Sequence, residues 1–348
     1  MSTVLITGGL GFIGSHTSVN LLERGFNILI IDSLVNSSIE NLKNIDKTIS
    51  KSNINKKYKG TYEFRKGDIK DTEWLNNIFH EYTFINKKIT SVIHLAGLKS
   101  VKESVINPLK YWKENIDISI SLLSVMKQHE CKTIVFSSTA MVYEPDLNKK
   151  LDEKSFISPP NPYGNSKLAI ENILRDIYKI EPLDWRIVNL RYFNPVGAHE
   201  LGFIGDNPLV KENNLFPAIA KTLKKEKEKI YIFGKDWPTI DGTCIRDYIH
   251  IMDLADAHFE VLNFLKNNKP QIIDLNIGTG KGTTVLEVIK LFENTNNVTL
   301  PYEFVGRREG DIPYLVADNT KSTKTLKWRP QKSLANMCKD FWNYISKN

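Results

Sequence analysis

A tyrosine and a lysine four residues apart, Tyr163 and Lys167, follow the proline-rich turn Ser158–Pro162, which predicts the start of a helix. Spacing of i and i+4 places a phenol and an ammonium on one helical face. A free phenol titrates near pH ~10, and a neighbouring cation lowers its pKa, so Tyr163 is a candidate base. Thr139 adds a hydroxyl at the end of an expected strand, where parallel sheets bind ligands. The pair alone also fits two surface side chains, but the three together suit oxidation of an alcohol.

A glycine turn occupies the beginning of the chain. Three glycines spaced three residues apart in Gly8–Gly14 join an expected strand, Val4–Thr7, to an expected helix, Ser15–Arg24. This spacing permits a tight turn and lets a pyrophosphate approach the helix N-terminus. A second expected strand, Ile28–Ile31, ends in Asp32. A carboxylate there accepts hydroxyls of an adenosine ribose and repels a 2′-phosphate, so the pattern favours NAD over NADP.

Apolar runs of strand length alternate with amphipathic segments of helix length, which is typical of a parallel α/β sheet. Regularity falters between Pro195 and Asn214, so we expect a doubly wound, Rossmann-like NAD domain over residues 1–195 and a smaller mixed α/β lobe over 196–348. The polar segment Lys47–Gly60 predicts a solvated loop. The expected strands are Val4–Thr7, Ile28–Ile31, Ser91–Leu95, Thr133–Ser138 and Ile187–Leu190.

Composition excludes several classes of protein. With 348 residues, 41% hydrophobic and 25% charged, the chain is neither collagen-like, coiled-coil nor wholly disordered. The net charge of +7 does not by itself imply nucleic acid. No apolar run approaches the roughly 20 residues of a membrane span, and no secretory signal opens the chain, so we expect a cytoplasmic protein. The three cysteines form no CxxC pair, which predicts reduced thiols and no metal site.

The chain resembles the extended short-chain dehydrogenase/reductase superfamily and, within it, the UDP-glucose 4-epimerases. The resemblance covers essentially the whole chain, and its later motifs are more specific than the glycines. The matching runs are Thr7–Thr17, Asp32–Ser37, Gly67–Ile69, His94–Lys99, Phe136–Tyr143, Pro162–Lys167, Leu190–His199, Asn213–Leu215, Asp241–Asp256 and Arg307–Asp311.

The resemblance implies two adjoining sites. The implied NAD site consists of Gly8, Gly11, Phe12, Ile13, Gly14, Asp32, Asn36, Ser37, Asp68, Ile69, Leu95, Lys99, Asn115, Tyr163, Lys167 and Phe193. The implied UDP-sugar site consists of Thr139, Tyr163, Asn194, Asn214, Leu215, Tyr231, Phe233, Arg246, Arg308, Asp311 and Leu315. Two guanidinium groups suit a diphosphate, and a carboxylate suits ribose hydroxyls.

The implied reaction inverts C4 of the sugar and interconverts UDP-galactose and UDP-glucose. Tyr163 takes the C4 hydroxyl proton while hydride passes to NAD, Thr139 hydrogen-bonds the same oxygen, and Lys167 lowers the phenol pKa. The 4-keto sugar turns and hydride returns to its other face. The resemblance further implies a homodimer through the helices after Pro108 and Pro162, and a return of segments 247–258 and 272–278 to the NAD domain.

Three departures from the family pattern stand out. Thr139 replaces a frequent Ser and keeps its hydroxyl, whereas Glu144 and Cys244 replace glycines away from the implied chemistry. Leu315 stands where members carry either a bulky Tyr or a small residue, and it is intermediate in size. We therefore expect partial tolerance of UDP-N-acetylglucosamine and UDP-N-acetylgalactosamine.

Other functions remain open at this point. A nucleotide-sugar 4,6-dehydratase would need an Asp-Glu pair after Thr139, where this chain has Ala140 and Met141. A 4-epimerase of UDP-glucuronate or UDP-pentoses would use the same machinery. From other classes, a non-catalytic NAD-binding regulator would be indicated by loss of Tyr163 or Lys167, which are both present, and a basic RNA-binding protein by salt-sensitive retention on RNA.

Overall fold

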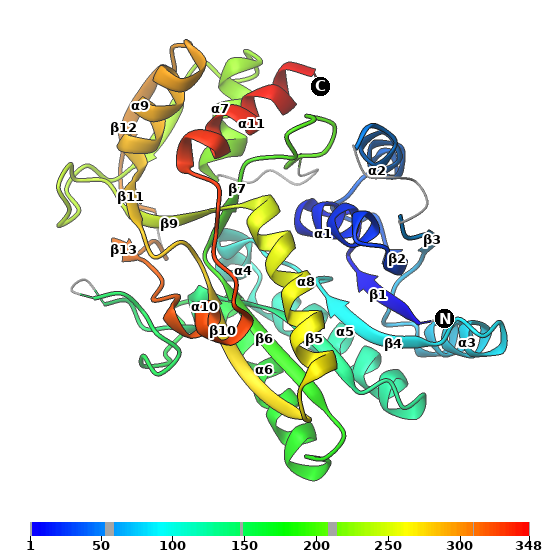
Figure 1. The fold of residues 1–348 in the computed structure, drawn as a ribbon. Helices are drawn as coiled ribbons and strands as arrows, with labels where there is room; N and C mark the ends of the chain where they lie inside the picture. The colour runs from blue at the N-terminus through cyan, green and yellow to red at the C-terminus, as the bar shows by residue number, and fades with distance from the viewer. Residues whose placement is uncertain (1, 53–58, 147–148, 208–213, 309, 348) are drawn as a thin grey trace.

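A parallel sheet of seven strands forms the larger part of the protein, here described from a computed structural model covering residues 2–52, 59–146, 149–207, 214–308 and 310–347 (Figure 1). The strand order is β10-β6-β5-β4-β1-β2-β3, and every pairing is parallel. The central strands are buried on both faces, which explains their continuous apolar runs. The strands are β1 (Thr3–Thr7), β2 (Asn27–Asp32), β3 (Tyr62–Lys66), β4 (Ile89–His94), β5 (Thr133–Thr139), β6 (Arg186–Tyr192) and β10 (Gln271–Ile277).

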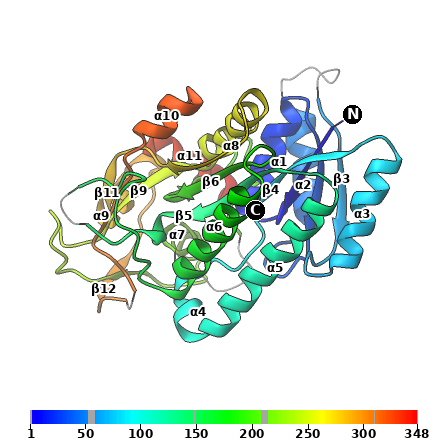
Figure 2. The same ribbon diagram turned by 90° about the horizontal axis from the view of Figure 1, so that it is seen from below.

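Helices cover both faces of this sheet, as Figures 1 and 2 show. One face packs against α1 (Phe12–Glu23), α2 (Glu40–Lys51) and α8 (Ile251–Asn267). The other packs against α3 (Thr72–Phe84), α5 (Pro108–Gln128) and α6 (Pro162–Ile180). The short helices α4 (Val101–Ile106), η2 (Ala140–Val142) and α10 (Thr320–Leu326) complete this half. The prediction of a doubly wound parallel sheet is confirmed.

A smaller half carries a separate apolar core. Strand β9 (Ile245–His250) pairs with β7 (Asn194–Val196), β11 (Gly282–Thr284) and β13 (Tyr314–Leu315), and β8 (Ile230–Phe233) pairs with β12 (Tyr302–Val305). Its helices are α7 (Leu215–Leu223), α9 (Val285–Asn296) and α11 (Leu334–Lys347). This is the expected lobe of mixed α/β structure.

The chain returns from the smaller half to the larger one. Within the expected segment 272–278, residues 272–277 belong to β10, which extends the large sheet beside β6. Of the expected segment 247–258, residues 251–258 lie in α8 against α1, but residues 247–250 lie in β9 of the smaller sheet. A discontinuous division of the chain into two domains therefore remains our proposal, with its boundary inside the second segment.

The prediction of a loop over Lys47–Gly60 is wrong for its first residues. Residues 47–51 continue α2, because Ile45 and Thr48 are buried on one face of an otherwise polar helix. Residues 53–58 lie outside the described part of the chain. A Lys- and Asn-rich composition hid this amphipathic pattern.

The three cysteines, Cys131, Cys244 and Cys338, are buried and form no disulfide, as their spacing predicts. Within the described ranges, none of the helices combines the length and apolar character needed to cross a bilayer.

Candidate active site

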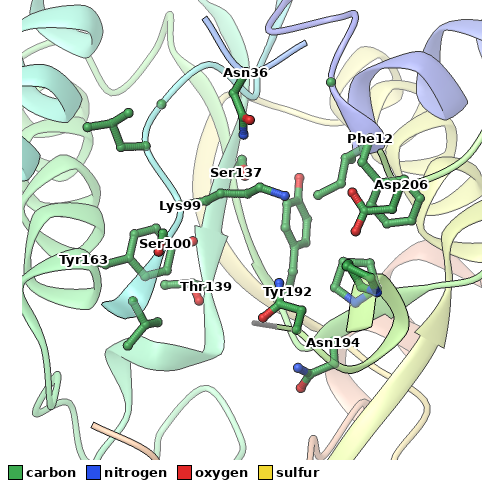
Figure 3. A pocket seen from close by; sticks show the side chains of 18 of the residues that line it. Phe12, Asn36, Lys99, Ser100, Ser137, Thr139, Tyr163, Tyr192, Asn194 and Asp206 are labelled. Atoms are coloured by element: carbon green, nitrogen blue, oxygen red, sulfur yellow. The ribbon is translucent and has the colours of Figure 1, made fainter. Parts of the chain in front are cut away.

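A cavity of about 870 Å³ opens at the carboxyl ends of the large sheet and reaches the smaller half. Its walls come from the loops after β1, β2, β4 and β5 on one side and from β8, β9, β13 and α7 on the other. Of the residues that the resemblance assigns to cofactor and substrate, all except Asn115 line this one cavity. Figure 3 shows several of them projecting into it.

The glycine turn after β1 forms one end of the cavity. Gly8 has φ +69, and a Cβ on it would lie 2.9 Å from the Ala96 amide nitrogen. A Cβ on Gly14 would lie 2.3 Å from the Gly8 carbonyl oxygen, so this glycine permits close packing of α1 on the turn. The N-terminus of α1 faces the cavity without a side-chain cap, leaving its amide groups available for an anion.

Asp32 ends β2 beside this turn and is held by three hydrogen bonds. Its Oδ2 accepts from the Leu10 amide at 3.0 Å. Its Oδ1 accepts from the Leu34 amide at 2.9 Å and from the Ser37 hydroxyl at 2.8 Å. The carboxylate is thus fixed where a ribose attached to a pyrophosphate on α1 would lie.

The start of α6 places Tyr163. Asn161 caps the helix by accepting a hydrogen bond from the Gly164 amide at 2.9 Å, and Pro162 occupies the first helical turn. Thr139 ends β5, and its Oγ1 accepts from the Met141 amide at 3.2 Å. Figure 3 shows Tyr163, Thr139 and Ser100 on the same wall of the cavity. A phenol and a hydroxyl on one wall can approach the same substrate oxygen.

Lys167 lies one turn further along α6, and its side chain is almost completely buried. Its Nζ stands 5.0 Å from the centre of the Phe136 ring. Burial lowers the pKa of Lys167 to about 8, because removal from water disfavours the ammonium form. A phenolate or another anion beside it would favour the charged form again.

The structure does not bring Asn115 to the cavity. Its Oδ1 accepts from the Leu98 amide at 2.8 Å, and its Nδ2 donates to the Ser166 hydroxyl at 2.9 Å. Asn115 therefore ties the loop that carries Lys99 to helix α6, directly behind Gly97 of the cavity wall, and its contact with NAD stays a prediction.

The opposite wall carries the charged groups. Arg308 makes a bidentate ion pair with Asp311, at 2.6 Å from Nη2 and 3.1 Å from Nε, and its guanidinium lies 5.1 Å from the Phe233 ring centre. Arg246 on β9 approaches the same carboxylate at 3.9 Å. Two cations share one anion here, which leaves positive charge for a diphosphate. Glu309 of the same run lies outside the described residues.

Sequence reasoning missed several lining residues, including Ser137, Tyr192 and Asp206 (Figure 3). Tyr192 donates to Nε2 of His258 at 2.6 Å, because the other ring nitrogen of this histidine is bonded to the Leu254 carbonyl. The position of Tyr192 at the end of β6 could have predicted that it lines the cavity, because parallel strands present ligand-binding residues at their carboxyl ends. Asp206 lies in an irregular loop, and no sequence pattern there predicts a place in the cavity.

Comparisons with known proteins agree with this geometry. The family model described as GDP-mannose 4,6 dehydratase matches residues 5–341. UDP-glucose 4-epimerase GEPI48 from Cyamopsis tetragonoloba is 43% identical over 99% of this chain and 95% of its own. The chain belongs to the UDP-glucose 4-epimerase family.

Solved structures of this family have the same fold. The UDP-glucose 4-epimerase from Bifidobacterium longum, in complex with NAD+ and UDP, has a TM-score of 0.90 and 39% identity, with 99% of this chain and 98% of that chain covered. The UDP-glucose-4-epimerase from Stenotrophomonas maltophila, with bound NAD and formylated UDP-arabinopyranose, has a TM-score of 0.91 and 38% identity at the same coverage.

Proposed function

We propose that this protein is an NAD-dependent epimerase that interconverts UDP-galactose and UDP-glucose by reversible oxidation at C4 of the sugar. The observation that carries the proposal is one wall with Tyr163, buried Lys167 and Thr139, facing Arg246 and Arg308 across a single cavity. This wall supplies groups for alcohol oxidation, and the facing wall supplies groups for a diphosphate. The names of the relatives and the NAD+ and UDP in the Bifidobacterium structure support it.

The cofactor-side residues fit NAD. The turn at Gly8 and Gly14 leaves no Cβ between the strand and the α1 N-terminus, and Asp32 stands where ribose hydroxyls would lie. Asp68 lines the cavity with its side chain half exposed, and we propose that it accepts a hydrogen bond from the adenine amino group. When bound, NAD would accept hydride from C4 of the sugar and return it. Because the reaction has no net redox change, the cofactor is expected to stay bound through turnover.

The proton moves between the sugar and the protein. Tyr163 removes the proton of the C4 hydroxyl, and Thr139 donates a hydrogen bond to the same oxygen. The Lys167 ammonium stabilises the phenolate, and burial strengthens this interaction by excluding water. After the sugar has turned, return of hydride to the other face of C4 would set the inverted configuration, and Tyr163 returns the proton to the oxygen to restore the hydroxyl.

The wall opposite Tyr163, called here the nucleotide-side wall, carries Arg246, Arg308, Asp311 and Leu315 and determines which substrate binds. Arg246 and Arg308 hold the diphosphate, and Asp311 exchanges its arginine contacts for ribose hydroxyls. Leu315 is buried on β13 opposite Arg246 and lines the cavity. Its intermediate size supports partial tolerance of UDP-N-acetylglucosamine and UDP-N-acetylgalactosamine. UDP-pentoses are the second candidate class, because the Stenotrophomonas structure holds a UDP-arabinopyranose derivative.

Dehydration is disfavoured despite the description of the matching family model. Residues Ala140–Val142, directly after Thr139, form a short helix without an acidic side chain. A 4,6-dehydratase needs an acid at this place to release the C6 hydroxyl as water. In this chain the 4-keto sugar would therefore be reduced again at C4 and would not lose water.

We further propose a homodimer through α5 and α6. Leu109, Trp112 and Ile120 repeat at helical spacing on α5 and are 81%, 40% and 47% exposed. Helices α5 and α6 pack side by side on the outside of the molecule (Figure 2). A second copy would cover this apolar stripe.

Three free cysteines fit a reducing compartment, which supports a cytoplasmic location.

Incubation of the purified protein with UDP-galactose, without added NAD, tests the proposed function. NMR of the products should show UDP-glucose accumulating to equilibrium. If no UDP-glucose forms even after NAD is supplied, the proposal is wrong.

A further inference from the structure

Behind the wall that carries Thr139 and Tyr163 lies a buried polar network centred on Glu171. Glu171 is fully buried on α6. Arg191 on β6 donates to both of its oxygens, at 2.9 Å from Nε and 2.6 Å from Nη2. The hydroxyl of Ser138 on β5 donates to Glu171 Oε1 at 2.5 Å. Three neighbouring elements therefore meet at one carboxylate.

The network is closed on its far side. Arg191 Nη1 donates to the Tyr143 hydroxyl at 2.9 Å, and Tyr143 donates to Asn276 Oδ1 at 2.6 Å. Asp274 on β10 accepts from Arg191 at 3.1 Å and from Arg175 at 2.6 Å. Two guanidiniums, of Arg175 and Arg191, thus pair with two carboxylates, of Glu171 and Asp274.

The positions of these residues couple the network to the site. Tyr163, Lys167 and Glu171 follow one another at i, i+4 and i+8, so they share one face of α6. Ser138 directly precedes Thr139 on β5. The Ser138–Glu171 hydrogen bond therefore joins the strand that presents the hydroxyl to the helix that presents the base.

Stability alone does not account for such a network. A buried ion pair contributes little to folding beyond what packed apolar side chains of the same size would contribute. Its geometry is demanding, however, since bidentate pairing fixes both partners in angle and distance. Rigid spacing is what a site needs when two groups must approach one oxygen.

We propose that Ser138 and Glu171 are positioning residues that set the distance between the Thr139 hydroxyl and the Tyr163 phenol. This inference rests on the proposed function. Removing the Ser138 hydroxyl keeps the Thr139 and Tyr163 side chains but removes the hydrogen bond that joins the end of β5 to α6. A misplacement of about 1 Å costs about a hundredfold in rate at a reacting centre, so a partial release is expected to cost about tenfold.

The test compares Ser138→Ala with Ser322→Ala. Ser322 is a fully buried serine of α10 whose hydroxyl donates to the Asn319 carbonyl at 3.0 Å, so its loss removes one buried hydrogen bond elsewhere. Both variants are assayed with UDP-galactose and with UDP-galactose deuterated at C4, and their thermal midpoints are measured. Ser138→Ala should lower kcat about tenfold, leave KM within about twofold, and raise the isotope effect on kcat. Ser322→Ala should change the thermal midpoint only.

Two further variants sharpen the result. Ser138→Thr restores the hydroxyl and should recover the wild-type isotope effect. Glu171→Gln should raise the isotope effect further. If this variant does not fold, the comparison of Ser138→Ala with Ser322→Ala tests the inference without it. A Ser138→Ala enzyme with kcat within about twofold of wild type, or one matched by Ser322→Ala, overturns the inference. Absence of turnover in the wild-type protein would instead contradict the proposed function.

Discussion

The two walls of the cavity are built in different ways. On the cofactor-side wall the fold holds each group: Asp32 accepts three hydrogen bonds from neighbouring residues, and Lys167 is buried in α6 against Phe136. On the nucleotide-side wall the charged groups hold one another, since Arg308 pairs with Asp311. Tyr231 on the same wall is 45% exposed. The first wall is preorganised, and the second must exchange partners when a ligand arrives.

This difference separates chemistry from binding. Preorganised groups contribute to the rate of the chemical step because they need no rearrangement during reaction. Groups that exchange an internal ion pair for a ligand mainly determine affinity, and the lost pair offsets part of the gain. Variants on the first wall should therefore change kcat, whereas variants on the second should change KM.

The largest effect is expected from Tyr163→Phe, which removes the base and leaves the ring. General base catalysis contributes about 10²–10⁴-fold, so kcat should fall by that factor while KM stays close to wild type. Tyr178→Phe on the same helix is the matched control, because Tyr178 packs against the core beneath the sheet. Steady-state rates with UDP-galactose decide the point. A Tyr163→Phe enzyme with more than about a tenth of wild-type kcat would show that another group is the base.

The second effect concerns the facing wall. Arg308→Ala should raise KM about tenfold to a hundredfold and leave kcat within a few fold, since a hydrogen bond to a charged group contributes about 1.5–3 kcal/mol. Arg307→Ala is the control, because Arg307 pairs with Asp236 and stacks on Trp237 at 4.1 Å. Calorimetric titration with UDP measures the affinities directly. Equal losses of UDP affinity in both variants would mean that Arg308 acts only through its positive charge and not through a direct contact with the diphosphate.

The glycine turn, Asp32 and the Tyr163–Lys167 pair could be predicted because each depends on a few residues close in sequence. Strand β3 was missed because all its side chains are at least partly exposed, which removes the apolar signal. The network around Glu171 could not be predicted, since it joins residues as far apart as Arg175 and Asp274.

Contacts made by tertiary packing also could not be predicted. The hydrogen bonds of Asn115 to Leu98 and Ser166 join three segments that meet only in the folded chain. The loop of Asp206 likewise reaches the cavity through packing that no local pattern encodes.

Buried histidines of the larger half should make the protein sensitive to acid. His16, His94 and His258 are completely buried there, and burial lowers their pKa values to about 3, 3 and 4. Below their unfolded pKa near ~6.5 the unfolded chain binds protons that the folded protein cannot. Above this pH the three histidines should therefore make a constant contribution to the free energy of unfolding. It should fall by up to about 1.4 kcal/mol per pH unit for each histidine as the pH approaches 4.

Urea unfolding at pH 7.5 and pH 5.5 measures this loss. His258→Gln should reduce the pH dependence by one histidine's share. Buried carboxyls with raised pKa, such as Asp247 and Asp253, offset part of the slope because they take up protons first in the folded state. Identical pH dependence in wild type and His258→Gln would contradict the account.

The smallest effect is one of selectivity on the nucleotide-side wall. Leu315→Tyr adds bulk where the sugar C2 substituent is expected, so turnover of UDP-N-acetylgalactosamine should fall about tenfold relative to UDP-galactose. The plain substrate measured on the same variant is the internal control. If the wild-type protein shows no detectable turnover of the acetylated pair, the role assigned to Leu315 is wrong.

The central claim is that hydride leaves and returns to the same carbon inside one closed site. Its most direct test is conversion of UDP-galactose deuterated at C4, followed by NMR of the UDP-glucose formed. Transfer to a bound cofactor and back predicts that deuterium stays at C4 with inverted configuration and does not exchange with water. Loss of the deuterium to solvent would show that C4 is inverted through proton abstraction from carbon, and would contradict the account.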